Sequence, residues 1–235
     1  MTLEQPKMPA TTRLLTVSAT YGAGGSVIAP LLAERLGLPF VDRLSRPQGP
    51  PADASERASA EELAEAPRSS FLESLALLSA EWNLPTQRDP EDLPGRVRRE
   101  NDDALRRLLE GEGAVVLGRA AAAALGRGPG LFHVRLDGPV DRRAARGAAW
   151  EGVDLDTARR RLDETDATRS RYVRKLYRRD PADASLYHLV LDATVLSTHD
   201  CVAVIAAAAQ ASWTFDELAV DEHLSSGRAR RDDPG

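Results

Sequence analysis

The residues of this chain best suited to chemistry are the glycines between Tyr21 and Ser26. They follow an apolar run, 14–18, and precede a segment with helical periodicity, 26–36. Glycine adopts the positive φ angles that let consecutive backbone N–H groups converge, and a helix N-terminus adds unpaired N–H groups and the positive end of its dipole. A strand, a glycine turn and a helix in this order predict a phosphate site. Its predicted residues are Tyr21, Gly22, Ala23, Gly24, Gly25 and Ser26.

This loop departs from the standard phosphate-binding motif, G-x-x-x-x-G-K-[ST], at two positions. Residues 19–26 keep the spacing, but Ala19 stands at the first glycine and Gly25 at the lysine. In the motif the lysine reaches the terminal phosphates and the hydroxyl ligates magnesium, so Ser26 is the predicted Mg²⁺ ligand.

Two other interpretations of the loop are open. Gly22 and Gly24 begin a dinucleotide-binding fingerprint, with Val27 at its third glycine position and Asp42 as the candidate ribose-binding acid. Alternatively, the glycines serve only the geometry of a strand-to-helix turn.

A second candidate for phosphate chemistry is the arginine-rich segment 169–179, which carries six cations in a chain of net charge −5. Arginine binds phosphate oxygens in pairs through its forked donors. At helical spacing four of these cations share a face, and they are the predicted catalytic residues: Arg171, Arg174, Lys175 and Arg178. The alternative is a solvated helix face that pairs with Asp163, Glu164 and Asp166.

The elements that must position these residues alternate along the chain. Strands are expected at 14–18, 38–42, 113–119, 131–136 and 186–192, and helices at 26–36, 54–66, 71–82, 95–110, 120–125, 140–149, 155–178 and 197–212. This order predicts a parallel sheet with helices on both faces and ligands at the carboxyl ends of the strands. The loop, Asp42, Gly118-Arg119 and Asp192 all fall at such ends. His133, His188, Cys201 and the tryptophans are read as structural or packing residues.

Composition limits the classes of function. Hydrophobic residues make up 42% of the 235 residues, and the negative net charge argues against a nucleic acid polymer or a membrane surface as partner. A single cysteine fits a reducing compartment, and no signal-type or membrane-spanning run is apparent, so a cytoplasmic location is expected. A monomer and a homo-oligomer are both compatible with the sequence.

Several ordered pieces resemble the cytidylate kinase-like family of the P-loop nucleoside monophosphate kinases. They are Tyr21-Gly-Ala-Gly-Gly-Ser, Leu32-Ala-Glu-Arg-Leu-Gly-Leu-Pro-Phe-Val-Asp42-Arg43, Val116-Leu-Gly-Arg-Ala120, His133-Val-Arg-Leu-Asp-Gly-Pro139 and Asp180-Pro-Ala-Asp183-Ala-Ser-Leu-Tyr-His-Leu-Val-Leu-Asp192. The resemblance covers roughly 13–210. It implies a P-loop NTPase-like three-layer α/β fold with a five-stranded parallel sheet, a helical insert that binds the nucleoside monophosphate, and an arginine-rich lid.

The resemblance also implies an activity and an organisation. It implies phosphoryl transfer from ATP with Mg²⁺ to CMP, dCMP or a related acceptor, with nucleotides as partners. Acceptor-binding positions would be Asp42, Arg119, Arg179, Asp180 and Asp183. The organisation would be a tail at 1–12, one domain at 13–215 with the insert at 44–94 and the lid at about 155–185, and a tail at 216–235. Two departures, Gly25 for the loop lysine and Leu186 for the last arginine of R-D-x-x-D-x-x-R, leave a catalytically weak nucleotide-binding module as the alternative.

Overall fold

The structure is a computed structural model and describes residues 12–42 and 93–229. The predicted insert, except its last two residues, and its helices 54–66 and 71–82 therefore lie outside the described residues. The same holds for most of the predicted tail 1–12 and for 230–235.

Five parallel strands form one sheet in the order β2-β3-β1-β4-β5. Their bounds are β1 Leu14–Ala19, β2 Phe40–Val41, β3 Ala114–Leu117, β4 Leu131–Asp137 and β5 Leu189–Asp192. Each lies in a segment predicted as a strand, so the α/β fold with a five-stranded parallel sheet is confirmed. β1 is the central strand, and the glycine loop therefore leaves the middle of the sheet.

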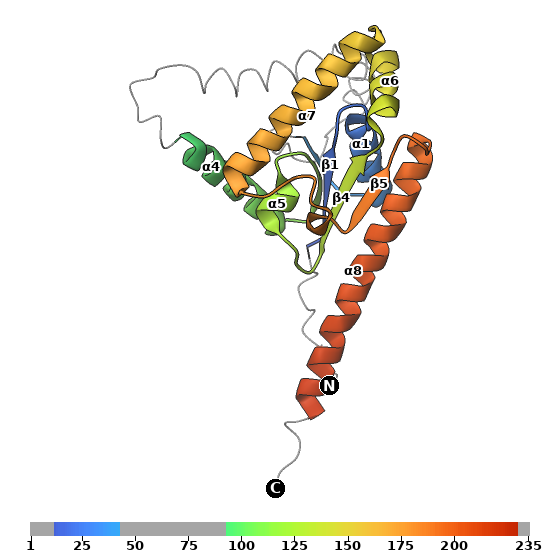
Figure 1. The fold of residues 1–235 in the computed structure, drawn as a ribbon. Helices are drawn as coiled ribbons and strands as arrows, with labels where there is room; N and C mark the ends of the chain where they lie inside the picture. The colour runs from blue at the N-terminus through green and yellow to red at the C-terminus, as the bar shows by residue number, and fades with distance from the viewer. Residues whose placement is uncertain (1–11, 43–92, 230–235) are drawn as a thin grey trace, which may run out of the picture.

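Six α-helices surround this sheet in the described part of the chain. They are α1 Gly25–Leu36, α4 Leu93–Leu109, α5 Ala121–Leu125, α6 Val140–Glu151, α7 Leu155–Tyr177 and α8 Thr198–Ala229. α1 and α8 cover one face, and α4 and α5 lie on the other. α6 and α7 pack together at the carboxyl ends of the strands, where α7 crosses the edge of the sheet (Figure 1).

The two faces of β1 explain this layering, because successive strand residues point to opposite sides. Leu15 and Val17 pack with α1 and α8, whereas Leu14 packs with α4 and α5. Cys201 is buried in the α8 side of the core, as expected for a packing residue.

The strand order does not support the dinucleotide interpretation of the loop. In that fold the strand that carries the ribose-binding acid neighbours the first strand. Here β3 lies between β1 and β2, at whose end Asp42 stands. The candidate acid is therefore displaced by a full strand from the glycine turn.

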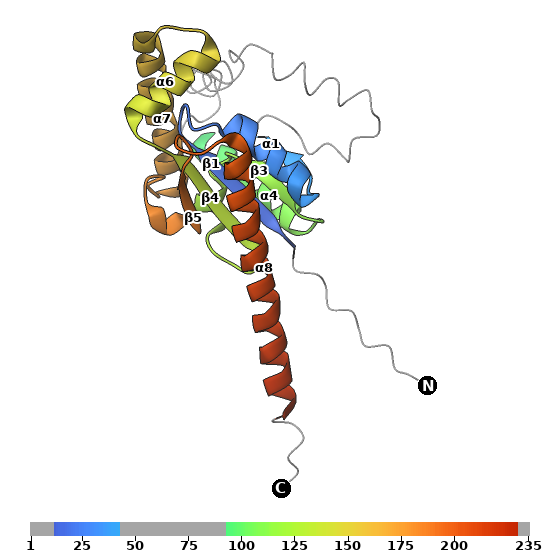
Figure 2. The same ribbon diagram turned by 90° about the vertical axis from the view of Figure 1, so that its right-hand side faces the viewer.

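Helix α8 is longer than its sequence predicts. It begins at Thr198, and the Oγ of the preceding Ser197 accepts from Asp200 N at 3.1 Å, as an N-cap residue does. The predicted end at 212 is wrong: the helix continues to Ala229, through most of the predicted tail, and extends well past the sheet (Figure 2). Residues 213–229 contain no proline and a single glycine, at 227, so this stretch lacks the residues that usually end a helix. Its more polar composition alone was not a sufficient signal for a helix end. Trp213, only 3% exposed, also packs in the core beyond the predicted end.

His133 in β4 and His188, the residue before β5, make structural contacts, as predicted: His188 Nδ1 accepts from His133 N at 2.8 Å. His133 is fully buried; its Nδ1 lies 2.7 Å from Thr16 Oγ1 and its Nε2 lies 2.6 Å from Gly126 O. The carbonyl can only accept, so Nε2 carries the proton and Nδ1 accepts from the threonine hydroxyl. Burial lowers the pKa of His133 to about 4.

This shift predicts acid destabilisation in a defined pH window. The unfolded chain takes up a proton at His133 near pH 6.5 and the folded chain only near pH 4. Stability from this residue is therefore full above pH 6.5 and falls by about 3 kcal/mol as the pH drops through this window. Urea unfolding at intervals from pH 7 to 4 measures it, and His133→Gln should show a smaller slope. Equal slopes in both proteins would contradict this explanation.

Candidate functional site

The glycine loop is held against α6 by a buried aromatic ring and by close backbone contact. Tyr21 packs with Ala144 and Leu162, and a Cβ at Gly147 would lie 2.3 Å from its ring. Gly22 has φ +74°, and a Cβ there would lie 2.1 Å from the carbonyl oxygen of Arg143. Tyr21 is thus an anchor by its side chain, and the loop presents its backbone to the site.

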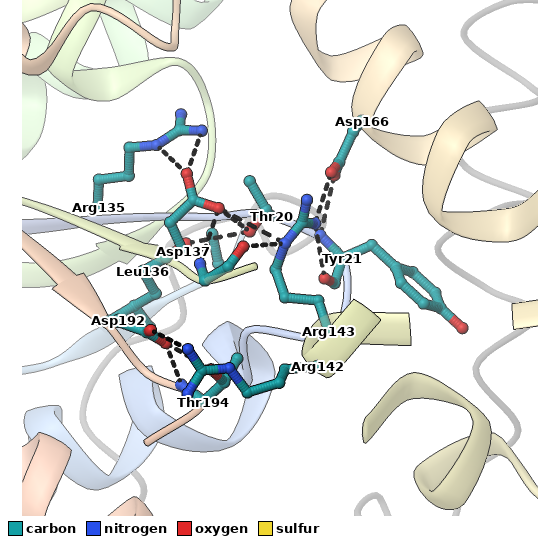
Figure 3. Close-up of polar contacts among 12 residues, drawn as sticks. Thr20, Tyr21, Arg135, Leu136, Asp137, Arg142, Arg143, Asp166, Asp192 and Thr194 are labelled. Atoms are coloured by element: carbon teal, nitrogen blue, oxygen red, sulfur yellow. Dashed lines mark hydrogen bonds and ion pairs between the residues drawn. The ribbon is translucent and has the colours of Figure 1, made fainter. Parts of the chain in front are cut away.

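Arg143 of α6 is the buried cation beneath this loop. Its guanidinium donates from Nε to Gly138 O at 2.8 Å and from Nη1 to Tyr21 O at 3.0 Å. Nη1 also lies 2.7 Å from Asp166 Oδ2, and the arginine side chain is only 6% exposed (Figure 3). Removing this charge from water requires such partners, and the carbonyls and the carboxylate supply them.

A carboxylate of α7 accepts a hydrogen bond from a backbone amide of the glycine loop. Asp166 Oδ1 accepts from Tyr21 N at 2.9 Å while its other oxygen binds Arg143 (Figure 3). Arg169, one helical turn further along α7, donates from Nη1 to Ala19 O at 2.7 Å and lies 3.7 Å from Asp166. The Tyr21 amide thus donates to a side-chain carboxylate that lies between two guanidinium groups.

A second carboxylate, Asp137 at the end of β4, extends the network toward β5. Arg135 binds its Oδ2 through Nε and Nη2 at 2.9 and 2.7 Å, and Thr20 Oγ1 donates to its Oδ1 at 3.1 Å (Figure 3). Burial acts to raise the pKa of Asp137, but the hydrogen bonds and charge of Arg135 outweigh it and lower the pKa below its ordinary value. Asp137 therefore stays ionised and fixes the loop at Thr20.

A second cluster surrounds the turn after β3. Arg119 Nη2 lies 3.5 Å from Asp42 O, so the structure brings these two predicted acceptor residues together. Arg119 and Ala120 have φ angles of 55° and 50°, a left-handed conformation that costs a non-glycine residue about 1–2 kcal/mol. The buried side chain of Asn101 holds this turn by donating to Arg119 O at 2.8 Å.

Helix α7 joins the two clusters. Arg169 contacts the loop, while Tyr177 at the other end accepts from Asn101 Nδ2 at 2.7 Å and donates to Asp102 at 2.8 Å. Between them, Val173 lines a small cavity together with Ser18 and Gly118. One face of α7 thus spans the carboxyl edge of the sheet from the loop to the Arg119 turn.

The four predicted catalytic cations lie on the other side of α7. Arg171, Arg174, Lys175 and Arg178 are all exposed, and Arg174 pairs with Asp180 at 2.8 Å. They share a face, as their spacing predicts, but the structure turns that face to solvent and directs Arg169 to the loop. The buried residues Leu162, Thr165, Val173 and Leu176 set the inward face of α7.

The two predicted acceptor aspartates after α7 each accept a backbone hydrogen bond within a turn. Asp180 accepts from Ala182 N at 3.0 Å, and Asp183 accepts from Ser185 N at 2.9 Å, at the start of the 3-10 turn Ala184–Leu186. Each of these backbone or side-chain hydrogen bonds lowers the pKa of its aspartate. Arg179 is exposed, and Leu186, where the pattern requires arginine, is buried against Ala122 and Tyr187.

The R-D-x-x-D-x-x-R pattern has a second, partial match on α7. Its D-x-x-D-x-x-R part also occurs at Asp163, Asp166 and Arg169, where two of the three residues contact the glycine loop. That spacing was the available signal for these two residues. Arg143 had none, because nothing in its local sequence marks it as buried.

Two further residues of α6 lie near the start of α1. A Cβ at Gly24, which has φ +85°, would lie 3.1 Å from the Trp150 ring and 3.6 Å from Arg146 Nη2. Arg146 also donates to Ala193 O. Asp192 at the end of β5 accepts from Thr194 N at 2.9 Å and pairs with Arg142 at 3.4 Å (Figure 3). Asp192 thus shapes the β5–α8 turn beside the loop.

The remaining loop positions differ in what they offer. Ser26 is exposed in the first turn of α1, so its hydroxyl is accessible.

Within 12–42 and 93–229, no group of three or more His, Cys, Asp or Glu side chains is arranged to hold a metal ion. No helix in the same residues is long and apolar enough to cross a membrane.

Comparison with known families agrees with this geometry. The model of the cytidylate kinase-like family matches residues 14–195. The chain belongs to the cytidylate kinase-like family. The match contains the glycine loop, the Arg119 turn, α6 and α7, and it ends before α8 begins at Thr198.

Individual relatives of this cytidylate kinase-like protein share only part of its length or a low sequence identity. A cytidylate kinase of Methanopyrus kandleri is 37% identical over 115 residues, which are 45% of this chain and 60% of that protein. The chain thus spans about three fifths of the length of that relative. A crystal structure of an uncharacterized protein from Eubacterium ventriosum is 19% identical, with a TM-score of 0.54 over 85% of this chain and 99% of the other. That structural similarity supports the fold alone.

Proposed function

We propose that this protein is a nucleoside monophosphate kinase-like phosphotransferase that uses ATP with Mg²⁺ and favours CMP or dCMP as acceptor. The observation that carries the proposal is the Asp166 carboxylate on the Tyr21 amide, between the guanidinium groups of Arg143 and Arg169. A site that binds one negative charge through an amide at the N-terminal side of a helix has the donors that a phosphate needs. Membership of the cytidylate kinase-like family supports the same assignment.

In this proposal the two clusters hold the two substrates. The donor triphosphate lies on the loop 20–26, and the acceptor phosphate lies at Arg119, which a buried asparagine and Asp42 position. An oxygen of the acceptor phosphate attacks the γ-phosphorus, forming a new P–O bond while the bond to the β-bridging oxygen breaks and ADP leaves. Such transfer needs alignment and neutralisation of charge more than covalent participation.

Magnesium fits the site through the nucleotide and not through a protein cage. Mg²⁺ usually keeps water ligands and binds phosphate oxygens with one or two protein oxygens. Ser26 has an accessible hydroxyl beside the loop. A bound Mg²⁺ ion would neutralise charge on the transferring phosphoryl group.

The catalytically weak module remains the second candidate, and a specific observation favours it. A Cβ at Gly25 would lie 2.5 Å from Ala19 Cβ, so the position of the usual lysine has no room for a side chain. A loop without that cation can bind nucleotides and transfer slowly.

A coupled ADP-release assay with all common nucleoside monophosphates separates the two candidates. The phosphotransferase should release ADP fastest with CMP or dCMP, and Gly24→Val should abolish the release. The matched control is Gly152→Val, because Gly152 has a similar φ of 64° with nothing near its Cβ position. ATP binding without ADP release for any acceptor would favour the weak module, and activity that survives Gly24→Val would exclude the loop as the phosphate site.

A further inference from the structure

The two departures of the loop from the standard motif, Ala19 for glycine and Gly25 for lysine, depend on each other, because the two side chains would occupy the same space. The Cβ of a residue at position 25 would point at the methyl of Ala19, 2.5 Å away, and at Leu117 Cδ1, 3.3 Å away. Real Cβ atoms do not approach so closely, and interiors do not yield to such overlap without cost. A side chain at 25 therefore requires glycine at 19, as in the standard motif, and alanine at 19 requires glycine at 25.

A guanidinium group contacts Ala19, the residue whose methyl group leaves no room for a side chain at position 25. Arg169 Nη1 donates to the carbonyl oxygen of Ala19 at 2.7 Å, and Arg169 is part of α7, remote in sequence from the loop. Its side chain is 27% exposed, so it is neither buried in the core nor free in solvent. A cation is thus present at the base of the loop, although it comes from another element.

The surroundings of Arg169 already contain a negatively charged group. Asp166 lies 3.7 Å from Arg169 and receives the Tyr21 amide and Arg143 Nη1 at 2.9 and 2.7 Å. A phosphate carries more charge and more acceptor oxygens than a carboxylate, so the same donors bind it at least as well. The side chain of Arg143 is only 6% exposed and that of Arg169 is 27% exposed, so Arg169 is the more accessible of the two cations.

We propose that Arg169 is a catalytic residue that supplies, from α7, the positive charge that a lysine of the loop supplies in the standard motif. The proposal rests on the proposed function, in which the loop binds the donor triphosphate. It deepens that function by assigning the cation that acts on the terminal phosphates, and it explains why Gly25 is compatible with transfer. α7 would then have to lie over the loop for the donor site to be complete.

Relocating the charge tests this assignment. Arg169→Met should lower the rate of ADP release with the best acceptor about 100-fold, the usual effect of losing one donor to a transition-state charge, and Arg169→Lys should lose less. Adding Ala19→Gly and Gly25→Lys to Arg169→Met should restore at least a tenth of the lost activity. The control is Arg160→Met, an exposed α7 arginine bonded to Thr157, which should behave as wild type. Wild-type turnover in Arg169→Met would overturn the assignment while leaving the proposed function intact.

Binding distinguishes this failure from a failure of the proposed function. If the wild type transfers no phosphate to any acceptor, the proposed function fails and the Kd for ATP decides the role of Arg169. A charge-assisted contact is worth enough to raise the Kd for ATP about 10- to 100-fold in Arg169→Met, with the Kd for adenosine unchanged. Equal Kd values for ATP in Arg169→Met and Arg160→Met would overturn the proposal.

Discussion

Replacing Gly22 by alanine is expected to lower the free energy of unfolding by about 3 kcal/mol and the turnover by about 100-fold. The added Cβ would lie 2.1 Å from the carbonyl oxygen of Arg143, and a backbone atom of a packed helix cannot move aside like a side chain. The φ of +74° adds strain for any residue with a Cβ. The loop must therefore leave α6, which displaces the Tyr21 amide from its partners. Urea unfolding and the ADP-release assay measure the two effects.

Gly37→Ala is the matched control for this substitution. Gly37 ends α1 with φ +65°, and nothing lies within 4 Å of its Cβ position, so the variant carries the backbone strain without the overlap. It should lose about 1 kcal/mol of stability and no activity. Similar losses in both variants would show that close approach to α6 does not matter.

Replacing Arg143 by methionine is expected to lower the free energy of unfolding by about 3 kcal/mol, because it leaves a partly buried carboxylate and two carbonyls without their cation. Asp166, Tyr21 O and Gly138 O would each lose a donor in a region where the arginine is only 6% exposed. Methionine keeps much of the side-chain volume, so the effect reports charge and hydrogen bonding more than packing. Urea unfolding at pH 7 gives the number.

Arg142→Met, at the neighbouring residue, tests whether the loss of stability in Arg143→Met depends on the burial of Arg143. Arg142 is 51% exposed and pairs with Asp192 at 3.4 Å, so its removal should cost less than about 1 kcal/mol. Adding Asp166→Leu to Arg143→Met should recover part of the loss, because the carboxylate that has lost its closest cation disappears. Equal costs for the two arginines would contradict the buried network.

The sheet and the glycine loop could be predicted from the sequence because local patterns determine them. Apolar runs such as 14–18 and the turn at Gly22–Gly25 carry their signal within a few residues, and alternation with helices predicts a parallel sheet. The identity of the inward face of α7 could not be predicted in the same way. Charge density favoured Arg171 to Arg178, whereas burial of Leu162, Val173 and Leu176 decides the orientation.

Long-range contacts account for the rest of the site. The partners of Asp166 are Tyr21 and Arg143, which come from two other elements, and no local pattern pairs them. Asp180 and Asp183 matched a family pattern by spacing, but their carboxylates are used by the turn that follows α7. Predictions for the insert 44–94 stay predictions, since all but its last two residues lie outside the described residues.

The central claim is that the loop 20–26 is the donor phosphate site, and backbone amide shifts on addition of ATP with Mg²⁺ test it most directly. The amides of Gly22 to Ser26 should shift with saturation, and the Tyr21 amide should shift with them as phosphate displaces the Asp166 carboxylate. Adenosine without phosphates should leave these amides unmoved. ATP binding that shifts residues elsewhere, with the loop amides unchanged at saturation, would contradict the claim.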